Sequence, residues 1–329
     1  MKIAILYSKP EMEAPKDELD VLVQADAVAG ALSSLGHVSE AVPVDLNMTE
    51  LMARLREVKP DLVFNLVESL AGQDRLIHLI PAVLDYLQIP YTGAKTEAVF
   101  LTSNKLLAKD TLKANGVATP EWLTMEDNAA DNTLPGKYII KSVWDHASKG
   151  LDEHSVVAVR DRPRLLKEME LRKSSLGGEC YAEAFIEGRE FNLSILAGAK
   201  GPEILPPAEI RFGDHMPGKI NIVGYRAKWH EDSSEYESTN RHFDFPPADE
   251  PLLQNLKTVA ARCWRLFSLR GYARVDFRVD HNGAPWVLEV NVNPCLSPDA
   301  GFAAAVERAG LSFKQAIERI IEDTMRNRT

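Results

Sequence analysis

The chain has 329 residues, 45% of them hydrophobic and 26% charged, which is an ordinary globular composition with room for two or three domains. Its formal net charge of −10 argues against nucleic acid as a partner, because proteins that bind a polyphosphate backbone usually present a basic surface. Three cysteines without a CxxC pair argue against a disulfide framework or a zinc site, and the short apolar runs argue against a signal peptide or a membrane span. We therefore expect a cytoplasmic protein with reduced thiols.

Residues 1–95 alternate short apolar runs with helical patterns. The apolar runs are "KIAILY", "HVSEAVPV" and "DLVFNLV", and amphipathic stretches lie near 18–35, 49–58 and 74–87. This alternation predicts βαβ units and a small parallel sheet. The Pro/Gly sequence "IPYTGA" then indicates the end of an N-terminal domain.

Two further domains are predicted, at residues 96–186 and 187–329. The first begins with a helix that contains "SNKLLAKDTLKANG" and continues with the strands "YIIKSVW", "SVVAV" and "ECYAEAFI". The second contains the strands "REFNLSILAG", "PEILPPAEIRF", "INIVGYRAKW" and "YARVDFRV…WVLEVNVNP", with helices near 250–269 and 313–325. The mixture of short strands and helices predicts an α+β fold.

A β-hairpin is predicted over residues 273–291, because two β-rich runs flank the turn sequence Asn282-Gly283. With that dipeptide at the centre of the turn, Asp276 lies opposite Glu289 on one face of the hairpin. The opposite face carries only apolar side chains, which are Val275, Phe277, Val279, Trp286, Leu288 and Val290.

Two facing carboxylates are unfavourable unless a cation lies between them. Arg274 is predicted opposite Asn291 on the same face, and carboxylate and amide oxygens are the ligands that Mg²⁺ prefers. The hairpin is therefore a candidate magnesium site. A half-solvated hairpin with cross-strand ion pairs is the alternative interpretation.

The ordered motifs "PYTG", "SNKLLAKDTL", "YIIKS", "AEAFIEGREF", "EILP", "YRAKW", "GYARVDF" and "LEVNVNP" resemble the ATP-grasp enzymes, and most closely the D-alanine–D-alanine ligase group. The resemblance runs over nearly the whole chain. It implies an ATP-grasp fold, in which an N-terminal α/β domain precedes central and C-terminal subdomains that hold ATP between their sheets. It also implies two Mg²⁺ ions, with Mn²⁺ as a possible substitute, and a possible homodimer.

The resemblance assigns roles to individual residues. Those implied to bind ATP are Lys105, Lys141, Ser148, Glu183, Phe185, Ile186 and Glu190. Those implied to hold the metal ions are Asp276, Glu289 and Asn291. Arg274 would lie beside the carboxyl group under attack, and Lys228 would reach the phosphates from a mobile loop. Lys141 also interrupts an apolar run, where an unpaired charge is costly, so we expect it to need the phosphates as its partner.

Three other segments were weighed against the ligase pattern. The stretch "SVWDHASKG" is expected to form the lid over the phosphates, although an ordinary hairpin loop is the alternative. The stretch "GDHMPGKI" nearly matches a Walker A loop, but Ile220 stands where Ser or Thr must hold Mg²⁺, so we interpret it as a loop. Near the C-terminus Cys295 stands where the family usually has a glycine of the oxyanion hole.

The segments that would build the first-substrate site also depart from the family. "SKPEMEAPKDELD" lacks the expected glycine-rich turn and "NLVESLAGQD" replaces a His-Gly-rich loop. Glu68 follows the third strand at its C-terminal end, where open α/β sheets bind ligands. We therefore expect Glu68 to meet a polar or cationic group of the substrate, with Asn293 and Ser297 as further contacts, and D-alanine to be a poor first substrate.

These observations predict an ATP-dependent carboxylate–amine ligase that forms an amide bond through an acyl phosphate and releases ADP and phosphate. Its partners would be a small carboxylic acid and an amine. An ATP-grasp kinase of small molecules and a non-catalytic nucleotide-binding module are the two alternatives. The complete set of Asp276, Glu289 and Asn291 disfavours the module.

Overall fold

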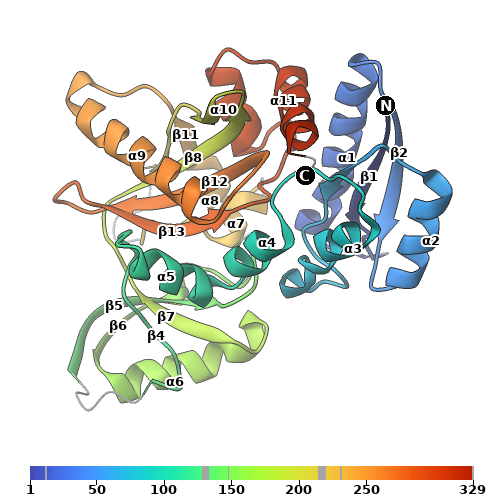
Figure 1. The fold of residues 1–329 in the computed structure, drawn as a ribbon. Helices are drawn as coiled ribbons and strands as arrows, with labels where there is room; N and C mark the ends of the chain where they lie inside the picture. The colour runs from blue at the N-terminus through green and yellow to red at the C-terminus, as the bar shows by residue number, and fades with distance from the viewer. Residues whose placement is uncertain (12, 128–132, 147, 214–219, 230–231, 328–329) are drawn as a thin grey trace.

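The computed structural model describes residues 1–11, 13–127, 133–146, 148–213, 220–229 and 232–327. Their strands form three sheets, around which the helices pack (Figure 1). The N-terminal sheet is parallel, has the order β2-β1-β3, and consists of β1 (Lys2–Ser8), β2 (Val38–Val44) and β3 (Leu62–Leu66). The accompanying helices are α1 (Lys16–Ser34), α2 (Met48–Val58), η1 (Asp74–Leu76) and α3 (Leu79–Leu87). The βαβ prediction is therefore confirmed.

The second sheet is antiparallel and has the order β4-β7-β5-β6. Its strands are β4 (Trp122–Leu123), β5 (Thr133–Ser142), β6 (Val156–Asp161) and β7 (Cys180–Ala184). The helices of this part of the chain are α4 (Thr96–Ser103), α5 (Lys105–Ala114), η2 (Glu153–Ser155), α6 (Arg162–Arg172) and η3 (Lys173–Leu176). Strands β5 and β7 place Lys141 and Glu183 on the side of this sheet that faces the pocket described below.

The third sheet is antiparallel and has the order β11-β10-β8-β12-β13, with β9 paired to β8. Its strands are β8 (Arg189–Gly198), β9 (Gly201–Ile204), β10 (Ala208–Phe212), β11 (Thr239–His242), β12 (Tyr272–Val279) and β13 (Pro285–Asn291). The helices of this part are α7 (Tyr225–Trp229), α8 (Ser234–Glu237), η4 (Pro247–Asp249), α9 (Glu250–Leu266), α10 (Gly301–Arg308) and α11 (Phe313–Arg326). None of the described helices is both long and apolar enough to cross a bilayer.

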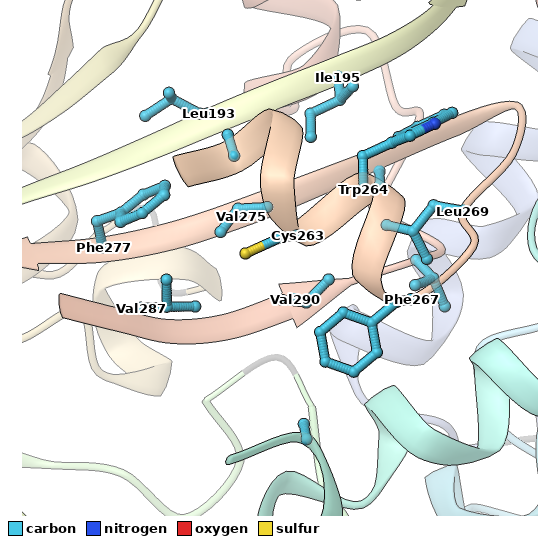
Figure 2. Close-up of a cluster of buried hydrophobic side chains, with 14 of the residues drawn as sticks. Leu193, Ile195, Cys263, Trp264, Phe267, Leu269, Val275, Phe277, Val287 and Val290 are labelled. Atoms are coloured by element: carbon cyan, nitrogen blue, oxygen red, sulfur yellow. The ribbon is translucent and has the colours of Figure 1, made fainter. Parts of the chain in front are cut away.

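The largest hydrophobic core lies between α9 and the third sheet. Figure 2 shows Cys263 of this helix beside Val275 of β12, with Trp264 and with Val290 of the edge strand β13 in the same cluster. Helices α4 and α5 contribute side chains to the same core, although they precede the second sheet in the chain. The central and C-terminal parts therefore share buried surface, and the domain boundaries at residues 95 and 186 stay predictions.

The stretch "INIVGYRAKW" is not the strand that its β-branched residues predict. Its second half forms α7, and residues 221–224 have no regular structure. Tyr225 N donates to Leu151 O at 3.1 Å, and a Cβ on Gly224 would lie 2.9 Å from the same oxygen. Close packing against this distant segment overrides the local strand propensity. Most of the Walker-like stretch, residues 214–219, lies outside the described residues.

The hairpin of β12 and β13 pairs Asp276 with Glu289, as predicted, but its turn and its strand register differ from the predicted ones. The turn is a three-residue loop closed by Asp280 N on Ala284 O at 3.1 Å, with Gly283 at φ 78°. This shifts the register by one residue, and an irregularity between Asp276 and Phe277 shifts it back. The two shifts cancel at the pair of carboxylates.

The predicted apolar face of the hairpin is wrong at two positions. Because Phe277 pairs with Val287, the buried position belongs to Val287 and not to Leu288 or Trp286. Trp286 is partly exposed, and its Nε1 donates to Asp280 at 3.1 Å.

Candidate active site

A pocket of about 830 Å³ lies between the three sheets. Every predicted site residue except Ser297 lines it. The pocket takes side chains from the loop after β3, from the start of α5, from the 142–151 segment and from the inner face of the third sheet. The fold therefore brings together motifs that are separated by almost the whole chain.

Glu183 lies at the bottom of the pocket between two lysines. It is 1% exposed, and its carboxylate contacts Lys141 Nζ at 2.6 Å and Lys109 Nζ at 2.7 Å. Burial would raise the pKa of Glu183, but the two ammonium groups outweigh burial and lower it. The expectation that Lys141 depends on phosphates alone is wrong, because Glu183 neutralises it inside the protein.

Two other lysines in the pocket have no acidic partner. Asn104 caps α5 by accepting from Leu106 N and Leu107 N, which places Lys105 in the first turn of the helix. Lys105 Nζ donates to the carbonyl of Asp145 at 2.5 Å. Lys228 makes no hydrogen bond or ion pair within the part of the chain that the structure describes. Burial lowers the pKa of both amines, so an anion placed here would be strongly favoured.

The carboxylates of Asp276 and Glu289 form an acidic shelf on β12 and β13. Asp276 accepts two hydrogen bonds from Arg274, at 2.7 and 2.8 Å, and a third from Asn192 at 2.8 Å. Glu289 contacts His146 Nδ1 at 3.0 Å. Burial would raise the pKa of Glu289, but His146 and the charge of Lys105 lower it well below its usual range. Each carboxylate therefore has a nitrogen-bearing side chain in contact with it.

The wall formed by the end of β7 and the start of β8 carries the predicted nucleotide contacts. Phe185 and Ile186 line the pocket half-buried. Glu190 pairs with Arg278 at 2.8 Å, and the Arg278 guanidinium lies 5.3 Å from the centre of the Phe185 ring. A flat apolar surface next to a carboxyl group that can accept hydrogen bonds suits a base and its sugar hydroxyls.

The opposite end of the pocket carries a second pair of carboxylates. Gln24 Nε2 donates to Glu68 at 2.9 Å and to Asp20 at 3.2 Å, so one amide joins the two acids. Asp20 also accepts from Ser297 Oγ at 2.7 Å and from Cys295 Sγ at 3.0 Å. Ser297 is thus buried behind Asp20 and does not line the pocket itself.

Burial disfavours the ionised form of Glu68. Burial raises its pKa to about 7; the hydrogen bond from Gln24 opposes this rise, and the charge of Asp20 adds to it. A cationic group in the pocket would restore its charge. Nearby, Asn293 donates to Val67 O at 3.1 Å and accepts from the Tyr272 hydroxyl at 2.7 Å, so its side chain is already held by protein groups.

The predicted lid segment contacts the N-terminal domain. His146 N donates to Asp74 at 2.7 Å, and Lys149 Nζ lies 3.3 Å from Asp74 and 3.8 Å from Asp17. The Tyr225 hydroxyl donates to Asp17 at 2.6 Å, which ties α7 to the same acid. Ser148 lines the pocket with a positive φ of 61°. The segment is held against the pocket by charges from another domain.

Comparison with known proteins agrees with this geometry. The family model of the D-alanine–D-alanine ligase C-terminus matches residues 155–322. The chain is 32% identical to the D-alanine–D-alanine ligase of Aquifex aeolicus, over 90% of this chain and 92% of that protein. It is 30% identical to the corresponding ligase of Moorella thermoacetica, over 98% of both proteins. The chain belongs to the D-alanine–D-alanine ligase family.

The solved structures agree on the fold. The D-alanine–D-alanine ligase of Bacillus anthracis, solved in complex with ATP, superposes with a TM-score of 0.74 at 23% identity, over 100% of this chain and 98% of that protein. The ATP-grasp fold class predicted from the sequence is therefore confirmed. As a member of this ligase family the chain is an ATP-dependent carboxylate–amine ligase.

Among the residues that sequence reasoning missed, Asp20 and His146 line the pocket, and Lys109 is buried against Glu183. Lys109 stands four residues after Lys105, and this helical spacing puts both on one face of α5. Asp20 lies near the start of α1, where it resembles any solvated acid in the first turns of a helix. His146 lies inside the predicted lid, but its contact with Glu289 spans 143 residues and leaves no local signal.

Proposed function

We propose that this pocket binds ATP with Mg²⁺ and joins a small carboxylic acid to an amine through an acyl phosphate. The observation that carries the proposal is the convergence of lysines and facing carboxylates in one pocket. Lys105, Lys141 and Lys228 would hold the phosphates, and Phe185 with Ile186 would contact the adenine. Glu190 would accept from the ribose hydroxyls.

The acidic shelf fits the metal that the family implies. Asp276 and Glu289 face each other with Asn291 beside them, and hard oxygen ligands of this kind suit Mg²⁺. Bound there, Mg²⁺ would neutralise the charge of the transferring phosphoryl group. Asp276 accepts from Arg274 and Asn192, and Glu289 contacts His146, so the shelf already holds polar partners that a metal ion would join or replace.

The reaction would then follow from the charges of the pocket. The lysines orient the γ-phosphoryl group toward the substrate carboxylate, which attacks phosphorus and releases ADP. The amine attacks the resulting acyl carbon, and phosphate leaves as the amide forms. Arg274 would stabilise the negative oxygen of the tetrahedral intermediate, because its guanidinium is held in place by Asp276.

We propose that the first substrate places its ammonium group between Glu68 and Asp20. The sequence relatives act on D-alanine by name, but the loops at this end of the pocket lack the family's pattern. D-alanine is therefore expected to be a poor first substrate, and another small amino acid a better one.

The homodimer that the resemblance implies is tested by light scattering, which should give twice 36.5 kDa.

The decisive experiment incubates the protein with Mg-ATP and a panel of D- and L-amino acids. Phosphate release together with a new amide supports the ligase. A stable phosphorylated product identifies a kinase, and ATP binding without consumption identifies a binding module.

The variant Glu289→Gln tests the acidic shelf. We expect it to lower turnover by at least about 100-fold while the fold is kept, because a neutral amide stabilises the metal far less than a carboxylate does. Steady-state ADP release and circular dichroism measure the two effects. The control is Glu97→Gln, at an exposed glutamate of α4, which should match the wild type. Near-normal ATP consumption by Glu289→Gln would refute the metal site.

A further inference from the structure

Arg241 is a cationic side chain of the pocket that has no role in the scheme above. It extends from β11, the edge strand farthest from β13 in the third sheet, and is exposed at the rim of the pocket. Its Nη1 donates to the backbone carbonyl of Asp299 at 2.7 Å. Its Nε lies 3.6 Å from the place that a Cβ on Gly301 would take. The guanidinium thus rests against the start of α10.

The acidic residue next to Arg241 is Asp299, whose carboxylate does not contact the guanidinium. No acidic side chain forms an ion pair with it in the described part of the chain, since Asp299 offers its carbonyl oxygen and not its carboxylate. Burial lowers the pKa of Arg241, the charge of Asp299 opposes this, and the like charge of Arg274 adds to the lowering. Arg274 is already neutralised by Asp276. The free N–H groups of Arg241 are therefore available for a planar anion, which a guanidinium binds through two parallel hydrogen bonds.

The charges around Arg241 differ from those around the lysines that are expected to bind the phosphates of ATP. The charges that act on Lys105 and Lys228 include Glu289, at the acidic shelf. The charged or titratable groups that act on Arg241 are Asp299, Arg274, Tyr236 and Cys295, and Glu289 is not among them. The N-terminus of α10 lies beside the guanidinium and adds partial positive charge.

We propose that Arg241 binds the carboxylate of the incoming amine substrate and so makes the enzyme select amino acids over amines that lack a carboxylate. This inference rests on the proposed ligase function. Arg241 would hold the carboxylate end at the rim of the pocket, while the amine end of the same molecule reaches the acyl phosphate beside Arg274. Arg241 acts on specificity, and the bond-forming steps remain those described above.

The test compares glycine, D-alanine and L-alanine, each with its own carboxamide, as the amine in the Mg-ATP assay. We expect the wild type to prefer the free carboxylate in kcat/KM, and Arg241→Gln to reduce this preference by about tenfold or more, since hydrogen bonds to charged groups are worth more than 1 kcal/mol. The rate with the carboxamides should change by less than about twofold. Arg241→Lys keeps the positive charge but cannot donate two parallel hydrogen bonds to a carboxylate. Its preference should therefore lie between those of the wild type and Arg241→Gln.

The control is Arg211→Gln on the adjacent strand β10, because Arg211 pairs with Glu209 and does not line the pocket. It should keep the preference of the wild type. Two outcomes would overturn the role of Arg241 and leave the proposed ligase function standing, provided that the wild type forms an amide. In one, Arg241→Gln keeps the wild-type preference for the free carboxylate. In the other, the folded variant loses activity equally with the amino acids and with their carboxamides. If the wild type consumes no ATP with any pair, the proposed function fails, and the inference fails with it.

Discussion

Buried glutamates in this pocket differ in protonation because their neighbours differ. Glu183 has two lysine partners, so its pKa is lowered although burial opposes this. Glu68 has an amide partner and a nearby carboxylate, so burial dominates and raises its pKa to about 7. The same side chain is therefore a permanent anion at one end of the pocket and a titrating group at the other.

The raised pKa of Glu68 predicts a pH dependence of stability. The folded state keeps the proton up to about pH 7, while the unfolded chain releases it near the ordinary glutamate pKa of 4.5. Between these values the folded state binds more protons, so the contribution of Glu68 to the free energy of unfolding falls as the pH rises. The loss amounts to at most about 3 kcal/mol, since one pKa unit corresponds to about 1.4 kcal/mol.

Glu68→Gln should remove this contribution and be more stable than the wild type at pH 8. The amide keeps an oxygen that can accept from Gln24. Urea unfolding at pH 5 and pH 8 measures the difference, with Glu97→Gln as the exposed control. Identical pH profiles for the wild type and Glu68→Gln would contradict the prediction.

At the scale of elements, the connection between β7 and β8 depends on a glycine. Gly188 has a φ of 140°, and a Cβ there would lie 2.0 Å from the carbonyl oxygen of Val279. The close approach brings the nucleotide wall against the end of β12. The hairpin glycine, Gly283, also has a positive φ, of 78°, but its Cβ position is open. Substitutions at the two positions therefore allow the cost of steric overlap to be compared with the cost of a positive φ alone.

Gly188→Ala should lower the free energy of unfolding by about 3 kcal/mol or more, because backbone atoms must move apart to admit the methyl group. Gly283→Ala should lower it by about 1 kcal/mol, the cost of the left-handed conformation alone. Chemical denaturation of both variants measures the difference. Equal losses would show that the strand connection relaxes freely.

At the scale of the whole molecule, acids of the N-terminal domain hold two segments of the ATP-grasp domains. Asp17 and Asp74 contact Lys149, and Asp17 also accepts from Tyr225. Burial would lower the pKa of Lys149, but Asp74 and Asp17 outweigh it and raise the pKa. The positive charge of Lys149 thus links the lid segment to the domain that carries Glu68.

Lys149→Met should loosen these segments and weaken ATP binding. We expect faster amide exchange at residues 148–151 and 221–224 and an increase in the KM for ATP of about fivefold, which corresponds to about 1 kcal/mol for a partly buried ion pair. Lys167→Met, at an exposed lysine of α6, is the control. Unchanged exchange in Lys149→Met would show that other contacts hold the lid.

The family motifs and the opposed carboxylates could be predicted from the sequence because they depend on short spacings. A strand alternates its side chains with a period of two, and an Asn-Gly dipeptide marks a hairpin, so Asp276 and Glu289 could be paired. The same local rules failed where the chain departs from regular pairing. The bulge that buries Val287 depends on how the strands pack against α9.

The sequence by itself determined the α+β order of elements, the ATP-grasp resemblance and the residues expected at the metal and the phosphates. Only the tertiary structure decided which charges meet. Asp20 with Cys295, His146 with Glu289 and Lys149 with Asp17 are each more than 100 residues apart. Such contacts follow from the packing of the three sheets around one pocket. No local sequence pattern predicts them, because the two residues of each pair belong to different parts of the fold.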